Sequence, residues 1–215
     1  YGKVQEIPQN ENTKFYPRSP YACAKLYGHT ITINYRESYD MFACSGILFN
    51  HESPMRGSEF VTRKITKGVV KWMKSKKPIM LGTIDAQRDW GHAEDYVEGM
   101  RLMLQQDKPD DFVLATGETN SVKDFASMVL HKLGIEHEQT DDYGNQICPD
   151  VYIDECYTKD HQLIITTDEK FKRPAEVDLL IGDSTKAREQ LGWKPKYDLD
   201  MLITDMLEWD LKRYG

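Results

Sequence analysis

The sequence predicts an α/β protein that contains part of a parallel sheet with flanking helices. Helical patterns alternate along the chain with short apolar runs. One of these runs, residues 41–49, is apolar on both faces, as is typical of a strand inside a parallel sheet. Only a few runs are long enough to be strands of that sheet. We therefore expect much of the sheet to be missing from this chain.

The helix-start signals and the loop that follows the buried strand set the order of the elements. Ser19, followed by Pro20, is suited to the N-cap of a first helix. Ser121 and Asp124 have the spacing of a capping box at the start of a later helix. Residues 50–58 are expected to form a loop where the strand ends. The whole pattern predicts helices at 20–39, 60–74, 93–105, 121–134, 184–191 and 199–212, short strands at 79–81 and 112–115, and a loop at 88–92.

The composition excludes several classes of function. The 215 residues have a formal net charge of -7, which argues against nucleic acid or an anionic membrane as a partner. The apolar runs are too short for a membrane span. Cysteine and histidine spacings match no metal site, so we expect no metal, reduced thiols and a cytoplasmic protein. The first residues, which lack an initiating Met and a signal core, resemble the interior of a longer chain.

Several residues that could carry chemistry are better explained as structural. Cys23 and Cys44 lie in apolar, periodic segments, where a free thiol behaves as a small hydrophobe. His92 follows a turn and is expected to be structural rather than catalytic. The tryptophans are expected to be core residues rather than a stacking platform: Trp72, Trp90, Trp193 and Trp209.

Tyr21 and Lys25 are the strongest catalytic candidates. They are four residues apart at the start of the predicted helix, so their side chains project from one face. An ammonium group beside a phenol favours the phenolate, the form of tyrosine that can act as a base. This spacing is common by chance, and the alternative is a surface tyrosine beside a solvated lysine. The residues around the pair decide between the catalytic and the surface interpretation.

The pair lies in FYPRSPYACAKLYG (15–28), directly before a long helix and a buried strand. That arrangement resembles the extended short-chain dehydrogenase/reductases. Within that superfamily the chain resembles the GDP-mannose 4,6-dehydratase family in a series of ordered blocks: YGKVQEIPQ (1–9), GILFNHESP (46–54), FVTRKIT (60–66), RDWGHAEDYV (88–97), FVLATGE (112–118), RPAEVD (173–178) and LGWKP (191–195). NHESP followed by FVTRKI is specific to this family rather than to its epimerase relatives.

The resemblance implies a division of the chain into two parts. Residues 1–58 would be the C-terminal remainder of a Rossmann-type cofactor domain. Residues 59–215 would be mainly a smaller C-terminal α/β domain that binds the nucleotide sugar, with residues near 79–118 contributing back to the sheet. The Gly-rich phosphate turn and the Thr-Ser-Glu run of the family are absent from this sequence. We therefore expect this chain by itself not to turn over GDP-mannose.

The resemblance also assigns roles to residues. Tyr21 would be the base that takes the sugar 4-hydroxyl proton as hydride passes to NADP, and Lys25 would hold the nicotinamide ribose. His51 and Arg56 match positions that contact the cofactor, although Met55 stands where relatives usually have a second Arg. The product implied is GDP-4-keto-6-deoxymannose, with loss of water.

The GDP-sugar would be bound by a second group of residues: Asn50, Lys64, Arg88, Arg173 and Glu176. Arg88 is suited to a diphosphate because a guanidinium donates two parallel hydrogen bonds. Its alternative is an ion pair with Asp85 or Asp89. Glu176 would accept from a ribose hydroxyl or a guanine N–H, and its alternative is to cap the following segment.

The resemblance implies a homodimer or homotetramer that pairs the 20–39 helix with its copy. Thr30, Ile31, Ile33 and Tyr35 give that helix more apolar surface than one core face needs. Two other readings stay open. The chain could be a non-catalytic sugar-nucleotide-binding module, or it could belong to another extended reductase, such as a dTDP-glucose 4,6-dehydratase or a UDP-sugar epimerase.

Overall fold

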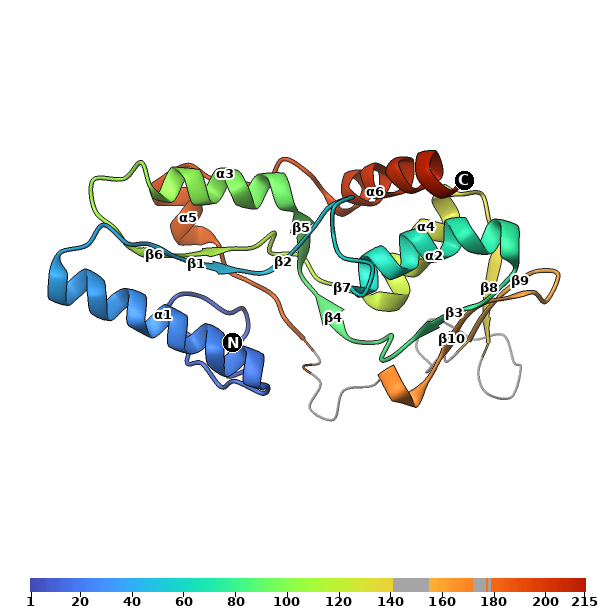
Figure 1. The fold of residues 1–215 in the computed structure, drawn as a ribbon, viewed down its shortest axis with the longest axis horizontal. Helices are drawn as coiled ribbons and strands as arrows, with labels where there is room; N and C mark the ends of the chain where they lie inside the picture. Colours follow the sequence, from blue (N-terminus) through green and yellow to red (C-terminus); the bar gives the residue numbers. More distant parts are fainter. Residues whose placement is uncertain (141–154, 172–176, 178) are drawn as a thin grey trace. The chain divides into compact units, whose positions relative to one another are not determined.

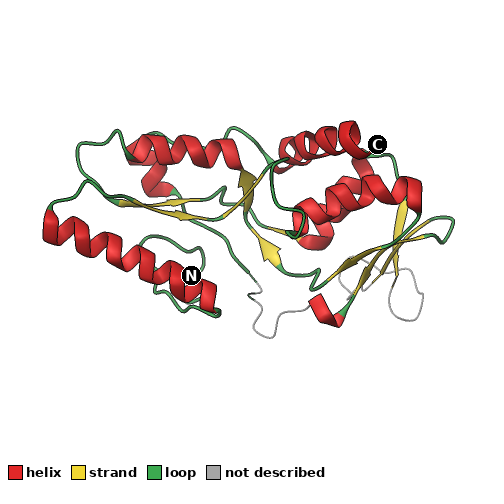
Figure 2. Cartoon of the chain, viewed as in Figure 1, coloured by secondary structure: helices red, strands yellow, loops and turns green. Residues whose placement is uncertain are grey.

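The structure is a computed structural model, and it describes residues 1–140, 155–171, 177 and 179–215. The chain divides into two compact units, each described here by itself. Unit 1 contains residues 1–51, 87–119 and 175–198, and unit 2 contains residues 52–86, 120–174 and 199–215. Both units combine helices with strands (Figure 2), which confirms the predicted α/β class.

A two-stranded parallel sheet forms the centre of unit 1 (Figure 1). In this sheet β1 (Ser45–Leu48) pairs with β6 (Asp111–Leu114), and Leu48 lies opposite Leu114. The unit also contains α1 (Pro20–Tyr39), β4 (Gln87–Arg88), β5 (Trp90–His92), α3 (Ala93–Met103) and α5 (Thr185–Leu191). The strand β2 (Asn50–Glu52) pairs with β5, and its first two residues belong to unit 1. The pairing of β1 with β6 confirms the partial parallel sheet.

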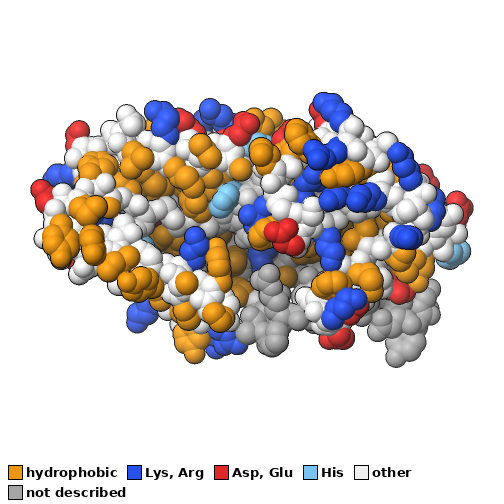
Figure 3. All heavy atoms as spheres, in the orientation of Figure 1, with side chains coloured by type: hydrophobic (Ala, Val, Ile, Leu, Met, Phe, Trp, Pro, Cys, Tyr) orange, Lys and Arg blue, Asp and Glu red, His pale blue; other side chains and the backbone are white. Residues whose placement is uncertain are grey.

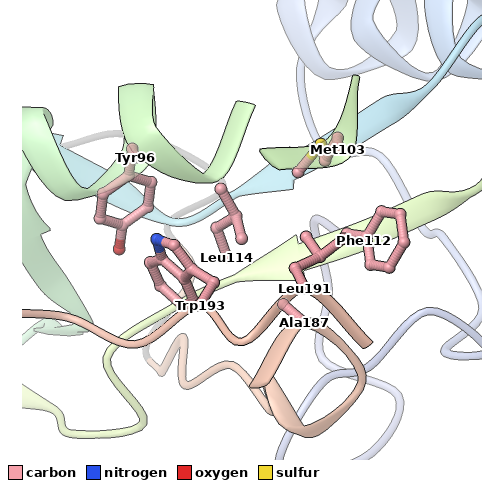
Figure 4. Packing of buried hydrophobic residues seen from close by; sticks show 7 residues of the cluster. All are labelled: Tyr96, Met103, Phe112, Leu114, Ala187, Leu191 and Trp193. Carbon is pink, nitrogen blue, oxygen red and sulfur yellow. The ribbon is translucent and has the colours of Figure 1, made fainter. Parts of the chain in front are cut away.

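Alternate side chains of β6 point to opposite faces of this sheet. Phe112 and Leu114 face α3 and α5, where they pack with Trp193 in a fully buried cluster (Figure 4). The other members of that cluster are Tyr96, Met103, Ala187 and Leu191. Val113 and Ala115 form a second buried cluster with Phe49 on the opposite side. The period-two alternation of a strand thus gives unit 1 a core on each face of its sheet.

Unit 2 combines a mixed sheet with three helices. The sheet has the order β3 (Ile79–Leu81), β10 (Leu163–Thr167), β9 (Glu155–Thr158) and β8 (His137–Thr140), parallel only between β3 and β10. The helices α2 (Val61–Ser75), α4 (Val122–Lys132) and α6 (Leu199–Tyr214) pack on one another beside it (Figure 1). The short elements β7 (Asn120–Ser121) and η1 (Glu169–Phe171) complete the unit. Its core is made by residues such as Ile65, Val69, Phe125, Ile164 and Leu202.

The local start signals read from the sequence are confirmed. The hydroxyl of Ser19 accepts a hydrogen bond from the Ala22 amide at 3.1 Å, and Pro20 occupies the first position of α1. Ser121 and Asp124 form a reciprocal capping box at the start of α4. These side chains satisfy amide groups that have no partner inside the helix.

Two segments predicted as loops contain strands instead. Residues 50–52 form β2, and residues 87–88 and 90–92 form β4 and β5. These strands are too short for a periodic pattern, and Asp89 and Gly91 are residue types that strands disfavour. The structure accommodates both Asp89 and Gly91. A Cβ at Gly91 would lie 2.5 Å from Cε2 of Tyr96, so the glycine makes room for a buried ring.

Three further expectations are corrected. β1 begins at Ser45, and the preceding Met41 and Phe42 are exposed, so the strand is shorter than its apolar run. Trp209 is 44% exposed, whereas the other three tryptophans are buried as expected. Cys23 is exposed on α1 rather than buried.

Candidate active site

Tyr21 and Lys25 lie on one face of α1, as their spacing predicts. The Lys25 Nζ atom is 5.7 Å from the centre of the Tyr21 ring. Tyr21 is 71% exposed, so its hydroxyl is open to a ligand. The Lys25 ammonium therefore lies beside the Tyr21 ring, and the tyrosine is accessible to solvent.

The end of α1 distant from this pair is fixed to the sheet. The Arg36 guanidinium donates two parallel hydrogen bonds to Asp111, from Nη1 to Oδ1 at 2.9 Å and from Nη2 to Oδ2 at 3.1 Å. The hydrogen bond to Asp111 raises the pKa of Arg36, which is charged in any case. A second attachment is the Phe15 ring, which meets His29 edge-on at 5.2 Å. No residue of α1 is buried, so these polar and aromatic contacts orient the helix.

Asn50 and His51 lie directly after the carboxyl end of β1, where ligands bind in parallel sheets. His51 Nδ1 is 2.8 Å from the Phe49 carbonyl oxygen, and its ring stacks on Tyr96 at 5.0 Å between centroids. Backbone and aromatic contacts thus fix the plane of the imidazole.

A buried carboxylate, Asp89, organises the neighbouring loop at the same end of the sheet. Its Oδ1 accepts from the Thr116 amide at 2.9 Å and the Thr116 hydroxyl at 2.7 Å. Its Oδ2 accepts from the amides of Gly117 at 2.9 Å and Gly182 at 3.3 Å. Burial raises the pKa of Asp89, and these hydrogen bonds act in the opposite direction. Arg88, the residue before it in the chain, is half-buried and donates from Nη1 to the Gln87 carbonyl.

The two aspartates that offered an alternative partner for Arg88 are both engaged elsewhere. Asp89 bonds to the loop, and Asp85 Oδ1 lies 3.2 Å from Lys123 Nζ within unit 2.

Arg56 belongs to unit 2, in the segment between β2 and α2. Its Nε lies 3.1 Å from Oε2 of Glu52, and its guanidinium carbon lies 3.5 Å from the centre of the Phe60 ring. Glu52 is almost fully buried, and burial raises its pKa, whereas a hydrogen bond from Thr62 and the charge of Arg56 lower it. The guanidinium thus lies over the Phe60 ring.

Lys64 also belongs to unit 2, on the first turn of α2. Its Nζ lies 3.9 Å from the centre of the Phe171 ring. Partial burial and the nearby Lys170 lower the pKa of Lys64, and Asp168 opposes this shift. A less hydrated ammonium of this kind is suited to an anionic ligand.

The structure thus brings together some of the expected site residues within each unit. Tyr21 and Lys25 form a pair, and Asn50 and His51 follow β1 in the same unit as Arg88. Arg56, in the segment before α2, and Lys64, on the first turn of α2, both belong to unit 2. Arg173 and Glu176, with Cys148, lie outside the described residues.

Two residues that organise the site were not found from the sequence. Asp89 was considered only as an ion-pair partner for Arg88, and Glu52 was read only as part of a loop. A carboxylate flanked by buried apolar residues, as Asp89 is by Trp90, is the signal that could have identified it, because such a group needs several donors. His92 is structural, as expected: it is buried, and its Nδ1 accepts from the Glu94 amide to cap α3.

Other kinds of site are not found among the described residues. No group of His, Cys, Asp and Glu there is arranged to hold a metal ion. Within the same residues, no helix combines the length and the apolar character that crossing a bilayer would need.

Comparison with solved structures gives the fold. RMD from Pseudomonas aeruginosa complexed with NADPH matches 99% of this chain and 63% of its own length, with a TM-score of 0.77 and 17% identity. The dTDP-glucose 4,6-dehydratase of Bacillus anthracis in complex with NAD matches 99% of this chain and 58% of its own, with a TM-score of 0.77 and 17% identity. The fold is therefore that of the Rossmann-type dehydratases and epimerases of nucleotide sugars.

Comparison of sequences gives the family. The model of the GDP-mannose 4,6 dehydratase family matches residues 1–206. The human GDP-mannose 4,6 dehydratase is 49% identical over 217 residues, and that of Dictyostelium discoideum is 50% identical over 219 residues; each alignment covers 99% of this chain. The chain belongs to the GDP-mannose 4,6-dehydratase family, which confirms the resemblance. It spans 55% of the human protein and 58% of the Dictyostelium protein.

Proposed function

We propose that this chain provides part of a GDP-mannose 4,6-dehydratase, an NADP-dependent lyase that converts GDP-mannose to GDP-4-keto-6-deoxymannose and water. The observation that carries the proposal is the match to the family over residues 1–206, with Tyr21 and Lys25 side by side and open on α1. The neighbour RMD is described in complex with NADPH, and other neighbours in complex with NAD. The choice of NADP rests on the family resemblance.

The residues present fit a nicotinamide cofactor. Tyr21 and Lys25 are exposed together, and the guanidinium of Arg56 is held on Phe60. His51 presents a ring whose plane is already fixed. NADP, when bound, would accept a hydride from the sugar and later return it. Tyr21 would take the proton from the sugar 4-hydroxyl, and Lys25 would stabilise the phenolate and hold the ribose hydroxyls.

The nucleotide sugar would be bound by the cations and polar side chains that the family resemblance assigns to it. Arg88 and Arg173 would bind the diphosphate, and Lys64 would add a cation whose hydration is already reduced. Asn50 would bind the sugar, and Glu176 would accept from the ribose or from guanine. In domain terms, residues 1–58 would belong to the cofactor domain and residues 59–215 mainly to the substrate domain, with 79–118 returning to the sheet.

Assembly and location are proposed on separate grounds. A homodimer or homotetramer through α1 is supported by the exposed aromatic side chains on that helix: Tyr21, Tyr27, Tyr35 and Tyr39. Hydrophobic side chains gather on the visible face of α1 (Figure 3), which suits burial against a second surface. Free thiols at Cys23, Cys44 and Cys156 support a cytoplasmic location.

The test separates binding from turnover. Purified 1–215 is titrated with GDP-mannose and with dTDP-glucose and followed by calorimetry and thermal shift, and it is then incubated with GDP-mannose and NADP. We expect GDP-mannose to bind, dTDP-glucose to bind at least tenfold more weakly, and no keto sugar to form. Preference for dTDP-glucose would refute the substrate assignment. Formation of the keto sugar would refute the expectation that this chain is inactive alone.

A further inference from the structure

Arg56 is held by a small cluster of side chains in the segment that joins β2 to α2. Its Nε lies 3.1 Å from Glu52 Oε2. The same carboxylate oxygen accepts a hydrogen bond from the Thr62 hydroxyl at 2.6 Å. The Arg56 guanidinium carbon lies 3.5 Å from the centre of the Phe60 ring. One oxygen of Glu52 therefore contacts both the arginine and the helix that follows it.

Burial makes this carboxylate an anchor rather than a surface charge. Glu52 is 2% exposed and Thr62 is 1% exposed, whereas the Arg56 side chain keeps 26% of its surface in solvent. Among the described residues, no hydrogen bond is found to either terminal nitrogen of Arg56. The Arg56 Nε is buried and has no hydrogen-bond partner among the described residues, so its contact with Glu52 is an ion pair. The guanidinium is thus restrained by the Glu52 charge at its Nε edge and by the Phe60 ring on one face. Its two terminal nitrogens remain available to an anion.

A buried arginine, Arg63, fixes the backbone of the same segment. Arg63, on α2, donates from Nε to the Pro54 carbonyl at 3.0 Å and pairs through Nη1 with Asp210 of α6. Arg63 and Asp210 are both buried. Residues 52–63 are therefore held at Glu52 by Thr62 and at Pro54 by Arg63. This arrangement leaves Arg56 little freedom to move.

We propose that Glu52, with Thr62, is a positioning residue that holds the Arg56 guanidinium in the orientation that binds a phosphate group of the nicotinamide cofactor. The inference rests on the cofactor role proposed for Arg56. A fixed guanidinium loses less conformational freedom when it binds than a mobile one does, so the anchor strengthens binding without touching the ligand.

The test uses the whole chain and isosteric changes at two threonines of α2. Thr62→Val removes the hydroxyl that fixes Glu52, and Thr62→Ser restores it. Thr66→Val is the matched control, because Thr66 is also fully buried and, among the described residues, the hydrogen bond of its hydroxyl goes to the helix carbonyl of Arg63, at 3.4 Å. Glu52→Gln, which removes the charge and keeps the shape, is the fourth variant. NADPH affinity, GDP affinity and the ¹⁵N signal of the Arg56 Nε–H are measured for each.

We expect Thr62→Val to weaken NADPH binding by about fivefold, the factor that corresponds to one lost hydrogen bond, and to leave GDP binding unchanged. Its Arg56 Nε–H signal should shift and exchange faster with solvent. Thr62→Ser should restore both properties, and Glu52→Gln should reproduce the loss. Thr66→Val should leave all three measurements near wild type, even where it lowers stability.

The inference fails if the Arg56 Nε–H signal is no more affected by Thr62→Val and Glu52→Gln than by Thr66→Val. It also fails if the signal moves but NADPH affinity is unchanged in a wild-type chain that binds NADPH. Absence of NADPH binding by the wild type would instead count against the proposed cofactor role. In that case pyrophosphate replaces NADPH as the anionic probe, and an unchanged pyrophosphate affinity in Thr62→Val overturns the inference.

Discussion

Replacing Asp89 by Asn tests whether a buried carboxylate fixes the loop at the carboxyl end of β6. Asp89 is fully buried and accepts four hydrogen bonds, two on each oxygen. In the variant, one oxygen becomes an NH₂ group that faces donors. If the NH₂ takes the place of Oδ2, the amides of Gly117 and Gly182 both lose their acceptor. If it takes the place of Oδ1, the Thr116 hydroxyl can turn and accept, so only the Thr116 amide is left without one.

The second orientation leaves fewer amides without an acceptor, so it determines the expected loss of stability. One buried N–H without an acceptor costs about 1–3 kcal/mol, and the remaining bonds are no longer charge-assisted. The neutral amide avoids the desolvation that raises the pKa of Asp89, which offsets part of the loss. We therefore expect the free energy of unfolding to fall by about 2 kcal/mol.

The matched control is Asp85→Asn, four residues earlier. It removes the same charge from a partly exposed side chain whose partner is Lys123, at 3.2 Å. A surface ion pair of this kind contributes about 0–1 kcal/mol. Urea unfolding followed by circular dichroism gives both free energies, and hydrogen exchange at Gly117 and Gly182 reports the loop directly. The reasoning is refuted if Asp89→Asn is as mild as Asp85→Asn, or if exchange at these two amides is unchanged.

Three further predictions concern stability and reactivity. Burial raises the pKa of Cys156 to about 12, so peptide mapping after brief iodoacetamide treatment at pH 8 should show Cys23 modified and Cys156 intact; equal labelling would contradict the burial of Cys156. The pKa of Glu52 is raised above its ordinary value of 4.5, so the contribution of the protonated Glu52 to stability is present below that value and is lost as pH rises through the folded-state pKa. The free energy of unfolding of the wild type should therefore fall relative to that of Glu52→Gln as pH increases from about 4 to 7. Parallel curves for the two proteins would contradict this. Asp210→Asn should lower the free energy of unfolding by about 3 kcal/mol, because it leaves the buried Arg63 charge unpaired. Asp205→Asn on the same helix should cost less than about 1 kcal/mol, because Asp205 is exposed. Equal losses in urea unfolding would contradict the buried pair.

The parts of the fold that depend on local signals could be predicted from the sequence. α1 covers the predicted residues because Ser19 and Pro20 start it and no helix breaker except Gly28 follows up to Tyr39, and these signals act within the segment itself. The capping box at Ser121 and the left-handed Gly192 after α5 are likewise local. The family blocks then placed these elements in a Rossmann-type fold, and the comparisons confirm it.

The features that were missed depend on contacts between distant segments. β2 and β5 are three residues long, and each exists because the other supplies its hydrogen bonds. Cys23 is exposed although its neighbours are apolar, because no residue of α1 is buried. The strands β8 to β10 could not be predicted from residues 135–170, because their antiparallel pairing gives an acidic segment a role that its composition does not reveal.

In the candidate site, the residues that would contact ligands could be predicted, whereas the residues that hold them in place could not. The residues that would contact ligands, such as Tyr21, Lys25 and Arg56, are exposed or half-exposed, and a motif identifies them because their residue types are needed for the reaction. The residues that support the site are buried acids. Glu52 contacts the Thr62 hydroxyl and Arg56, and Asp89 accepts from the Thr116 hydroxyl and from backbone amides. Serine, threonine and glycine occur too widely for such partners to be read from spacing. A carboxylate that must be buried is therefore the useful signal, even where a cation is adjacent in the sequence, as Arg88 is to Asp89. Its oxygens also require neutral donors, and the loop that provides them becomes rigid.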